Sequence, residues 1–255
     1  MIEKKETTRI FGRRVYRYLQ VDSTNKIAFR LAREGEVEGT VVVADEQSKG
    51  EGRRGSWWFS PREGLWFSLI LRPSLNFSQI SLLNILGAVA VAETLQSFLT
   101  YRPVFIYWPN DVMIGEKKVG GVMCRFRAEK DKLSFVIMGI GINLNVKEFP
   151  SQLQKEVTSL RLEEGYFISR NLFLDLLLRK LEDEYICSSK SWFPILEKAR
   201  SLFPLLGKPV KLQTPQEEWL GYPIDIDDRG SLIVRLDSGV QRVIDAGMSV
   251  RILKG

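Results

Sequence analysis

The segment at residues 49–59, "KGEGRRGSWWF", holds residue types that could bind an anion beside a flat ring. Its glycines can adopt conformations that bring backbone N–H groups close to a phosphate. Arg53 and Arg54 add forked donors suited to phosphate, and either adjacent tryptophan could stack on a base. The segment is not a Walker loop, because no Lys-Ser/Thr pair opens a helix after it. An ordinary glycine-rich turn has the same composition, so this pattern by itself leaves both interpretations open.

Two further segments place polar groups at the ends of predicted elements. "DSTN", residues 22–25, lies where a helix begins and offers hydroxyls and an amide to a polar ring, although the same residues are common helix caps. In "YWPNDV", residues 107–112, the proline holds the residue before it extended. Asn110 and Asp111 then follow rigidly from a strand end, although Asn-Asp also favours a simple turn.

Two glycine-containing segments could let a flat ligand approach bare backbone. In "KKVGGV", residues 117–122, the alternation of a β-hairpin would aim only one of the two lysines at a given face. The paired glycines could form a wall for a ligand, or they could mark a bulge beside solvated lysines. In "GIGINLN", residues 139–145, small residues within an apolar strand indicate the close approach of something flat.

The elements that must position these groups are helices and strands in mixed order. Hydrophobic periodicity, caps and breakers predict helices at residues 23–33, 79–99, 171–188 and 191–201. Strands are predicted at 40–47, 65–72 and 103–109, followed by a hairpin over 111–126 and a buried strand from 133. After Pro204, short strands separated by "DRGS" and "DSG" turns predict a small β-barrel or sandwich that leans on the larger domain.

Composition narrows the possible functions. The chain of 255 residues contains no histidine, which excludes Ser-His and Cys-His nucleophiles and the usual imidazole metal sites. Cys124 and Cys187 show no metal-binding spacing. The net charge of +6 suits nucleic acid, a nucleotide or an acidic protein partner. The N-terminus has no apolar signal core and no apolar run is long enough to span a bilayer, so a cytoplasmic protein is expected.

The five polar segments occur in one order: DSTN, then Q-x-x-G-x-G-R-x-G with a following Trp, then WPND, then K-[apolar]-G-G, then G-I-N-x-N. In this order they resemble the biotin protein ligases, the biotin–[acetyl-CoA carboxylase] ligase family, from about Val21 to Asn145. The resemblance implies an α+β fold in which a mixed or antiparallel sheet with helices forms a class II synthetase-like core. It also implies a catalytic domain over 1–204 and an SH3-like C-terminal β-barrel over 205–255.

The resemblance implies a two-step ligase that uses Mg²⁺ with ATP. Biotin and ATP would give biotinyl-5′-AMP, and a lysine of a biotin carboxyl carrier domain, such as that of acetyl-CoA carboxylase, would then take the biotin. The residues that it assigns to biotin are Ser23, Thr24, Asn25, Gln47, Gly50, Gly121 and Gly141. Those that it assigns to ATP or the adenylate are Arg53, Arg54, Trp58, Lys118 and Asn143. The expected catalytic residues are Lys118, Arg53, Asn110 and Asp111, with Asp111 orienting or deprotonating the incoming lysine.

The chain departs from the family pattern at three positions. Glu51 stands where the loop commonly has its first arginine, Ser56 where a later basic residue is common, and Tyr107 where a lysine commonly precedes WPND. These changes should weaken the hold on phosphates, unless Arg54 or Lys49 compensates. About twenty residues precede DSTN, too few for a helix-turn-helix, so a ligase that binds neither operator DNA nor a membrane is expected. A homodimer is possible.

Two alternative functions remain open on sequence grounds. A lipoate or octanoate ligase of the same superfamily would share the core and a lysine, although the Trp after the glycine loop favours biotin. A non-catalytic protein that binds nucleic acid would explain the basic charge and the Arg-Gly-Trp loop. A third interpretation, a degenerate family member without activity, follows from Glu51 and Ser56.

Overall fold

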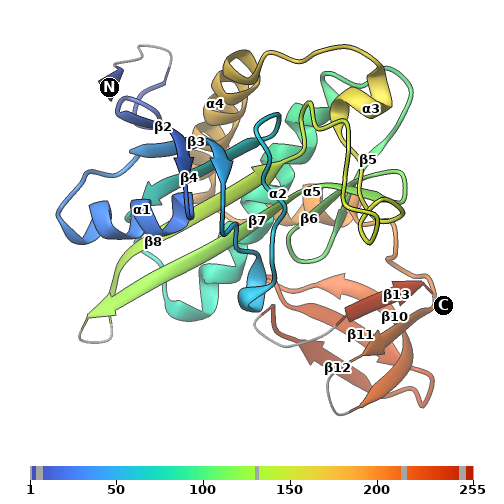
Figure 1. The fold of residues 1–255 in the computed structure, drawn as a ribbon. Helices are drawn as coiled ribbons and strands as arrows, with labels where there is room; N and C mark the ends of the chain where they lie inside the picture. Colours follow the sequence, from blue (N-terminus) through green and yellow to red (C-terminus); the bar gives the residue numbers. More distant parts are fainter. Residues whose placement is uncertain (1, 4–7, 130–131, 214–216, 247–250, 255) are drawn as a thin grey trace.

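The computed structural model describes residues 2–3, 8–129, 132–213, 217–246 and 251–254. Figure 1 shows a large sheet flanked by helices, with a smaller sheet at the lower right that carries the C-terminus. Over the described residues, the large sheet has eight strands in the order β1-β2-β3-β4-β8-β7-β6-β5. These strands are β1 (Ile2–Glu3), β2 (Val15–Val21), β3 (Val41–Gln47), β4 (Leu65–Leu71), β5 (Val104–Tyr107), β6 (Asp111–Ile114), β7 (Lys117–Glu129) and β8 (Lys132–Ile142). The helices are α1 (Thr24–Arg33), α2 (Ile80–Gln96), α3 (Leu160–Glu164), α4 (Arg170–Ser188) and α5 (Phe193–Leu202).

The large sheet is mixed, as the family resemblance implied, because β2 pairs with β3 in parallel and the other neighbours are antiparallel. Side chains alternate along each strand, so the sheet has two different faces. Val42 of β3 and Ile70 of β4 pack with α1, whereas Val41 and Leu69 belong to the main core that contains α2. α4 and α5 pack against α2. The sheet is therefore a middle layer, with α1 on one face and the other long helices on the opposite face.

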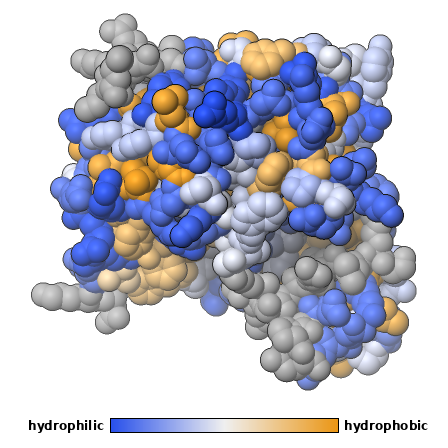
Figure 2. Space-filling model, viewed as in Figure 1, coloured by the Kyte–Doolittle hydropathy of each residue, from blue (hydrophilic) through white to orange (hydrophobic). Residues whose placement is uncertain are grey.

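α2 is the central helix of the main core. With the short turn before it, the segment Phe77–Gln96 is long and apolar enough to pass as a membrane span by composition, but 78% of its apolar 18-residue stretch is buried inside the fold. It contacts α4 and α5 on one side and the strands β5 to β8 on the other. Figure 2 shows apolar residues in several separate groups among polar ones on the visible face of the molecule. The uniformly apolar sequence of α2 thus corresponds to its place between two layers.

The C-terminal part forms the predicted set of short strands. They are β9 (Val210–Gln213), β10 (Glu218–Ile226), β11 (Leu232–Leu236), β12 (Gln241–Ile244) and β13 (Arg251–Lys254). These described strands form an antiparallel sheet in the order β12-β11-β10-β9-β13. No pairing joins β12 to β13 within the described residues, so there the SH3-like unit is an open sheet and not a closed barrel.

The turn between β10 and β11 docks the C-terminal sheet onto the large domain. Gly230 has a φ of +79°, and its carbonyl accepts a hydrogen bond of 2.9 Å from the Trp108 indole N–H. The neighbouring carbonyl of Arg229 accepts a bond from the Ser81 hydroxyl. A glycine is required at 230, because a Cβ there would lie 2.9 Å from Ile85 and the backbone is left-handed. The "DRGS" signal that predicted a turn therefore also marks the junction.

The strands β1 and β2 and the helix α3 lie outside the predictions from sequence. β2 reads "VYRYLQV" and is largely half-buried or exposed, so its apolar signal is weak. The segment that leads into it is fixed by a distant residue: the buried carboxylate of Glu182 in α4 accepts the backbone N–H groups of Arg9, Ile10 and Phe11. Such a tertiary anchor leaves no local pattern. The Trp108–Pro109 peptide bond, expected only to hold Trp108 extended, is cis.

A group of charged side chains joins the three helices behind the sheet. Glu93 of α2 contacts Lys180 of α4 at 2.5 Å and Lys198 of α5 at 3.0 Å, and Lys198 also contacts Glu184 at 2.5 Å. Burial would raise the pKa of Glu93, but hydrogen bonds from the two lysines outweigh it and hold the pKa below its ordinary value. The pairs that Glu93 makes with the two lysines therefore stabilise the helical layer only while Glu93 is ionised.

We predict that Glu93→Gln lowers the free energy of unfolding by about 1–2 kcal/mol at pH 7, because it removes a partly buried charge from two lysines. A folded pKa below the ordinary carboxyl value of about 4.3 means that the contribution is complete above that pH and is lost as the pH falls below it. Urea unfolding at pH 7 and pH 3 measures this. Glu129→Gln, at the exposed end of β7, is the control. A deficit of the same size at both pH values would contradict the prediction.

Candidate active site

A cavity of about 770 Å³ lies on the face of the large sheet that α1 only partly covers. On β8, Phe135 and Ile137 pack beneath α1, and the alternation of the strand then presents Gly139 and Gly141 on the same face. Gly121 of β7 is paired directly with Gly141. These three glycines form the floor of the cavity, and the segment 49–58 runs across it as a cover.

Two side chains lie over the glycine floor, one from α1 and one from the covering segment 49–58. A Cβ at Gly139 would overlap the side chain of Asn25, from α1. A Cβ at Gly141 would lie 2.7 Å from the indole nitrogen of Trp58, and one at Gly121 would lie 3.2 Å from the same ring. The close approach at these glycines is made here by the protein's own Asn25 and Trp58, and the approach of a ligand stays a prediction. The indole nitrogen of Trp58 is buried and has no hydrogen-bond partner.

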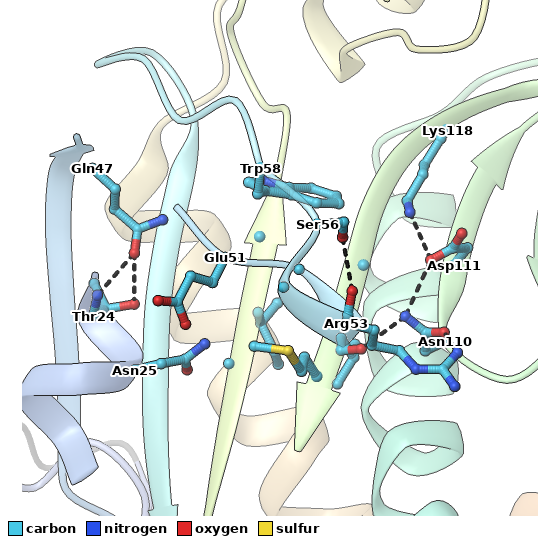
Figure 3. A pocket seen from close by; sticks show the side chains of 18 of the residues that line it. Thr24, Asn25, Gln47, Glu51, Arg53, Ser56, Trp58, Asn110, Asp111 and Lys118 are labelled. Atoms are coloured by element: carbon cyan, nitrogen blue, oxygen red, sulfur yellow. Dashed lines mark hydrogen bonds and ion pairs between the residues drawn. The ribbon is translucent and has the colours of Figure 1, made fainter. Parts of the chain in front are cut away.

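Uncharged polar groups gather at the α1 end of the cavity (Figure 3). Gln47 Oε1 accepts from the Thr24 backbone N–H at 2.8 Å and from the Thr24 hydroxyl at 3.1 Å. The Asn25 Oδ1 atom lies 2.7 Å from the hydroxyl of Ser68, which is fully buried. Ser23 takes the N-cap position of α1, yet its buried hydroxyl caps nothing and has no partner. This end of the cavity thus combines a fixed amide and hydroxyl network with one free hydroxyl.

Charged groups form a chain at the opposite end (Figure 3). Arg53 donates to Asn110 Oδ1 at 2.7 Å, and Asn110 donates to Asp111 Oδ1 at 3.1 Å. The same Asp111 oxygen lies 2.7 Å from the ammonium of Lys118. That ammonium also lies 5.0 Å from the centre of the Trp58 ring, within cation–π range. A lysine beside a carboxylate and a guanidinium can exchange partners with an incoming anion.

The C-terminal sheet also reaches this site. Arg53 donates a hydrogen bond to the backbone carbonyl of Ala246, and Gln213 of β9 lines the cavity. Nothing near either position in the sequence indicates the contact.

The structure brings most of the predicted site residues to one cavity. The predicted residues that line it are Thr24, Asn25, Gln47, Arg53, Trp58, Asn110, Asp111, Lys118, Gly121 and Gly141. Ser23 and Gly50 lie just behind the lining, and Gly50 is so close to Ser60 and Trp58 that a side chain there would clash. The buried Asn143 lies outside the lining and donates to the Thr158 carbonyl at 2.9 Å. The side chain of Arg54 lies outside the described part of the structure.

Several lining residues were not assigned from sequence. Glu51 and Ser56 were noted only as departures, although both line the cavity. Met123 could have been found, because it lies two residues beyond Gly121 on β7 and alternation places it on the same face. Phe67 and Gln213 carry no motif that would have indicated them.

Comparisons with known proteins place the chain among the biotin protein ligases. Residues 17–143 match the biotin/lipoate A/B protein ligase family, and residues 205–248 match the biotin protein ligase C-terminal domain. The chain is 31% identical to the biotin–[acetyl-CoA-carboxylase] ligase of Paracoccus denitrificans, over 87% of this chain and 94% of that protein. It is 32% identical to the bifunctional ligase/repressor BirA of Bacillus subtilis, over 95% of this chain and 76% of that protein. A solved biotin protein ligase from Aquifex aeolicus, in complex with biotin and ATP, has a TM-score of 0.82 and 30% identity, covering 94% and 99% of the two chains.

We predict that Ser23→Ala changes the stability of the ligand-free protein by less than about 0.5 kcal/mol. Removing an N-cap serine usually costs about 1 kcal/mol, but this hydroxyl makes no cap bond and is buried without a partner. The matched control is Ser68→Ala, which breaks a satisfied buried network and should cost about 1–2 kcal/mol. Urea unfolding compares the two variants. An equal loss in both would mean that Ser23 already has a structural partner.

Proposed function

The chain belongs to the biotin protein ligase family, and we propose that it activates biotin with ATP and transfers the biotin to a lysine of a biotin carboxyl carrier domain. In the first step a carboxylate oxygen of biotin attacks the α-phosphorus of ATP, the bond to the bridging oxygen breaks, and pyrophosphate leaves. In the second step the lysine amine attacks the acyl carbon of biotinyl-5′-AMP, loses a proton and forms an amide, and AMP leaves. Neither step requires a histidine or a covalent enzyme intermediate.

The arrangement of the cavity supports this proposal most directly. A glycine floor lies between an end whose side chains can hydrogen-bond and, apart from Glu51, are uncharged, and a charged end that can hold an anion. Biotin has the same polarity, with a flat ureido ring at one end and a carboxylate at the end of an apolar chain. A ligand oriented in this way would present its carboxylate to Lys118, which is what reaction with a phosphate requires.

The uncharged end would bind the ureido ring. The free hydroxyl of Ser23 and the hydroxyl of Thr24 can each bond a ring oxygen or N–H group. Gln47 is held by two bonds to Thr24 and by a 2.9 Å bond to Ser60, so its orientation is set before ligand arrives. Fixed donors and acceptors of this kind reduce the entropy lost on binding. Asn25 would extend the same polar wall over Gly139.

The charged end would neutralise the reacting groups. Lys118 would leave Asp111 to bridge the biotin carboxylate and the α-phosphate, where negative charge concentrates in the transition state. Asp111, released from that pair, would accept a hydrogen bond or the proton from the incoming lysine amine. Arg53 would hold the phosphate of the adenylate. Arg54, outside the described side chains, would add a second guanidinium.

The nucleotide would lie at the Trp58 side of the cavity. We propose that the indole of Trp58 stacks on adenine, after exchanging its contacts with Gly121 and Gly141. Asn143 would support the site from behind through its bond to Thr158. Mg²⁺ would enter with ATP and be held mainly by phosphate oxygens, because Mg²⁺ takes few protein ligands in such sites. Asp111 is the lining carboxylate that fits it best.

The remaining expectations concern the setting of the enzyme. We propose that residues 1–204 form the catalytic domain, that 205–255 form the SH3-like unit, and that the protein acts in the cytoplasm. Its partner would be the carrier domain of acetyl-CoA carboxylase or of another biotin-dependent enzyme. A homodimer, and action without operator DNA or a membrane, stay predictions from the sequence.

The proposal is tested by exchange of labelled pyrophosphate into ATP with purified protein. Exchange that depends on biotin is expected, followed by biotin incorporation when a carrier domain is added. Lipoate and octanoate are offered in parallel, and incorporation of either in place of biotin would overturn the substrate assignment. Salt-dependent binding to an oligonucleotide without any exchange would instead favour the nucleic-acid alternative.

For the site, we predict that Lys118→Ala slows adenylate formation by about 100-fold or more, because a charge that acts mainly in the transition state is lost. Biotin binding, measured by calorimetry, should weaken far less. Lys117→Ala is the matched control, since the neighbouring lysine is exposed and points away from the cavity. Equal losses in binding and in exchange rate would show that Lys118 only binds.

A further inference from the structure

Glu51 occupies the position where the family resemblance led us to expect an arginine, and its carboxylate is held from two sides. Lys26 of α1 lies 3.2 Å from Glu51 Oε1, and Arg125 of β7 lies 2.7 Å from Glu51 Oε2. The Glu51 side chain is only 22% exposed and hangs from the loop toward Asn25 (Figure 3). One loop carboxylate thus connects both walls of the cavity.

The loop around Glu51 is closed on itself by backbone hydrogen bonds. Gly52 N–H donates to the Ser56 carbonyl at 2.7 Å, and Trp58 N–H donates to the Gly50 carbonyl at 2.9 Å. Glu51 and Trp57 form an isolated antiparallel bridge. These bonds make a small hairpin that could move as a unit over the cavity. The ion pairs of Glu51 attach that hairpin to α1 and β7.

We propose that Glu51 is a positioning residue that holds the loop closed over the cavity before any ligand binds. That the ligand is biotin or ATP rests on the proposed function. That Glu51 holds the loop closed does not depend on it. An arginine at position 51 would face Lys26 and Arg125 with like charge, so it could not make this attachment. With Glu51 the chain has one positive charge fewer for binding phosphate. The conformational entropy of the loop is then lost when the protein folds and not when the ligand binds.

The surroundings of the two cations support a specific attachment. The hydrogen bond and charge of Glu51 raise the pKa of Lys26 above its ordinary value, more than the nearby Asp22 does. Arg125 reaches Glu51 from the same face of β7 that carries Gly121 and Met123. Both cations are about two-fifths exposed, so each pair contributes modestly and is screened by salt.

Hydrogen exchange of the ligand-free protein tests the proposal, with the peptide over residues 50–58 as the readout. We expect Glu51→Gln to speed exchange of the loop amides about three- to tenfold, since each opening breaks fewer interactions. Arg125→Met should act in the same direction, and added KCl should reduce protection in the wild-type protein. Glu129→Gln is the control. Exchange in Glu51→Gln as slow as in that control overturns the proposal.

Charge reversal separates the ion pair from a general effect of substitution. Glu51→Arg should open the loop further than Glu51→Gln, and Glu51→Arg combined with Arg125→Glu should restore most of the protection. A double variant that melts within a few degrees of the wild type but leaves the loop open would also overturn the proposal.

Steady-state kinetics add a readout that a purely structural role would not move. With the ordering entropy transferred to the binding step, Glu51→Gln should raise KM for ATP about three- to tenfold and leave kcat nearly unchanged. A fall in kcat with KM unchanged would count against positioning. Hydrogen exchange of the loop amides is measured without substrates. A wrong role for Glu51 and a wrong ligase assignment would therefore be seen in different experiments.

Discussion

The site depends on one constraint, the absence of side chains at three positions of the large sheet that face the same way. Gly121, Gly139 and Gly141 interrupt strands that elsewhere bury large residues, and β pairing brings them together on β7 and β8. A methyl group at Gly139 or Gly141 would collide with Asn25 or Trp58. The sheet thereby supplies a rigid floor whose depth is set by backbone atoms. Everything else in the site is arranged around that floor.

Two kinds of interaction hold the side chains around the glycine floor, namely hydrogen bonds at one end and ion pairs at the other. The uncharged end is fixed by short hydrogen bonds among Thr24, Gln47 and Ser60, which solvent and salt hardly affect. The charged end relies on ion pairs that are partly exposed, such as Lys118 with Asp111. A ring that must be recognised is thus met by rigid partners, while a reacting anion is met by partners that can be exchanged.

Much of the fold could be predicted because its signals are local. Runs of apolar and β-branched residues identified β3, β4 and β8, and periodicity identified α1, α2 and α4 within a few residues. Gly121 and Gly141 were expected to form a wall that lacks side chains, and both line the cavity. The contacts that could not be predicted join residues far apart in the sequence. The partners of Glu51 come from α1 and β7, the partner of Asn143 comes from a loop, and the segment that leads into the polar strand β2 is fixed by Glu182 in α4. Ser23 shows most clearly how far residue type alone can predict a contact. Serine favours a helix cap, but the Ser23 hydroxyl makes no cap hydrogen bond.

The hydrogen bond from Arg53 to the Ala246 carbonyl joins the glycine loop to the C-terminal part of the chain, so the stability of the closed loop depends in part on that contact. A ligand that draws Arg53 toward a phosphate removes one of the contacts that join the two sheets, in addition to those at Gly230 and Arg229. If ligand binding shifts the equilibrium of that junction, thermodynamic linkage requires that the state of the junction shifts the ligand affinity by the same factor. A carrier protein that leaned on the C-terminal sheet would thus alter nucleotide retention without entering the cavity.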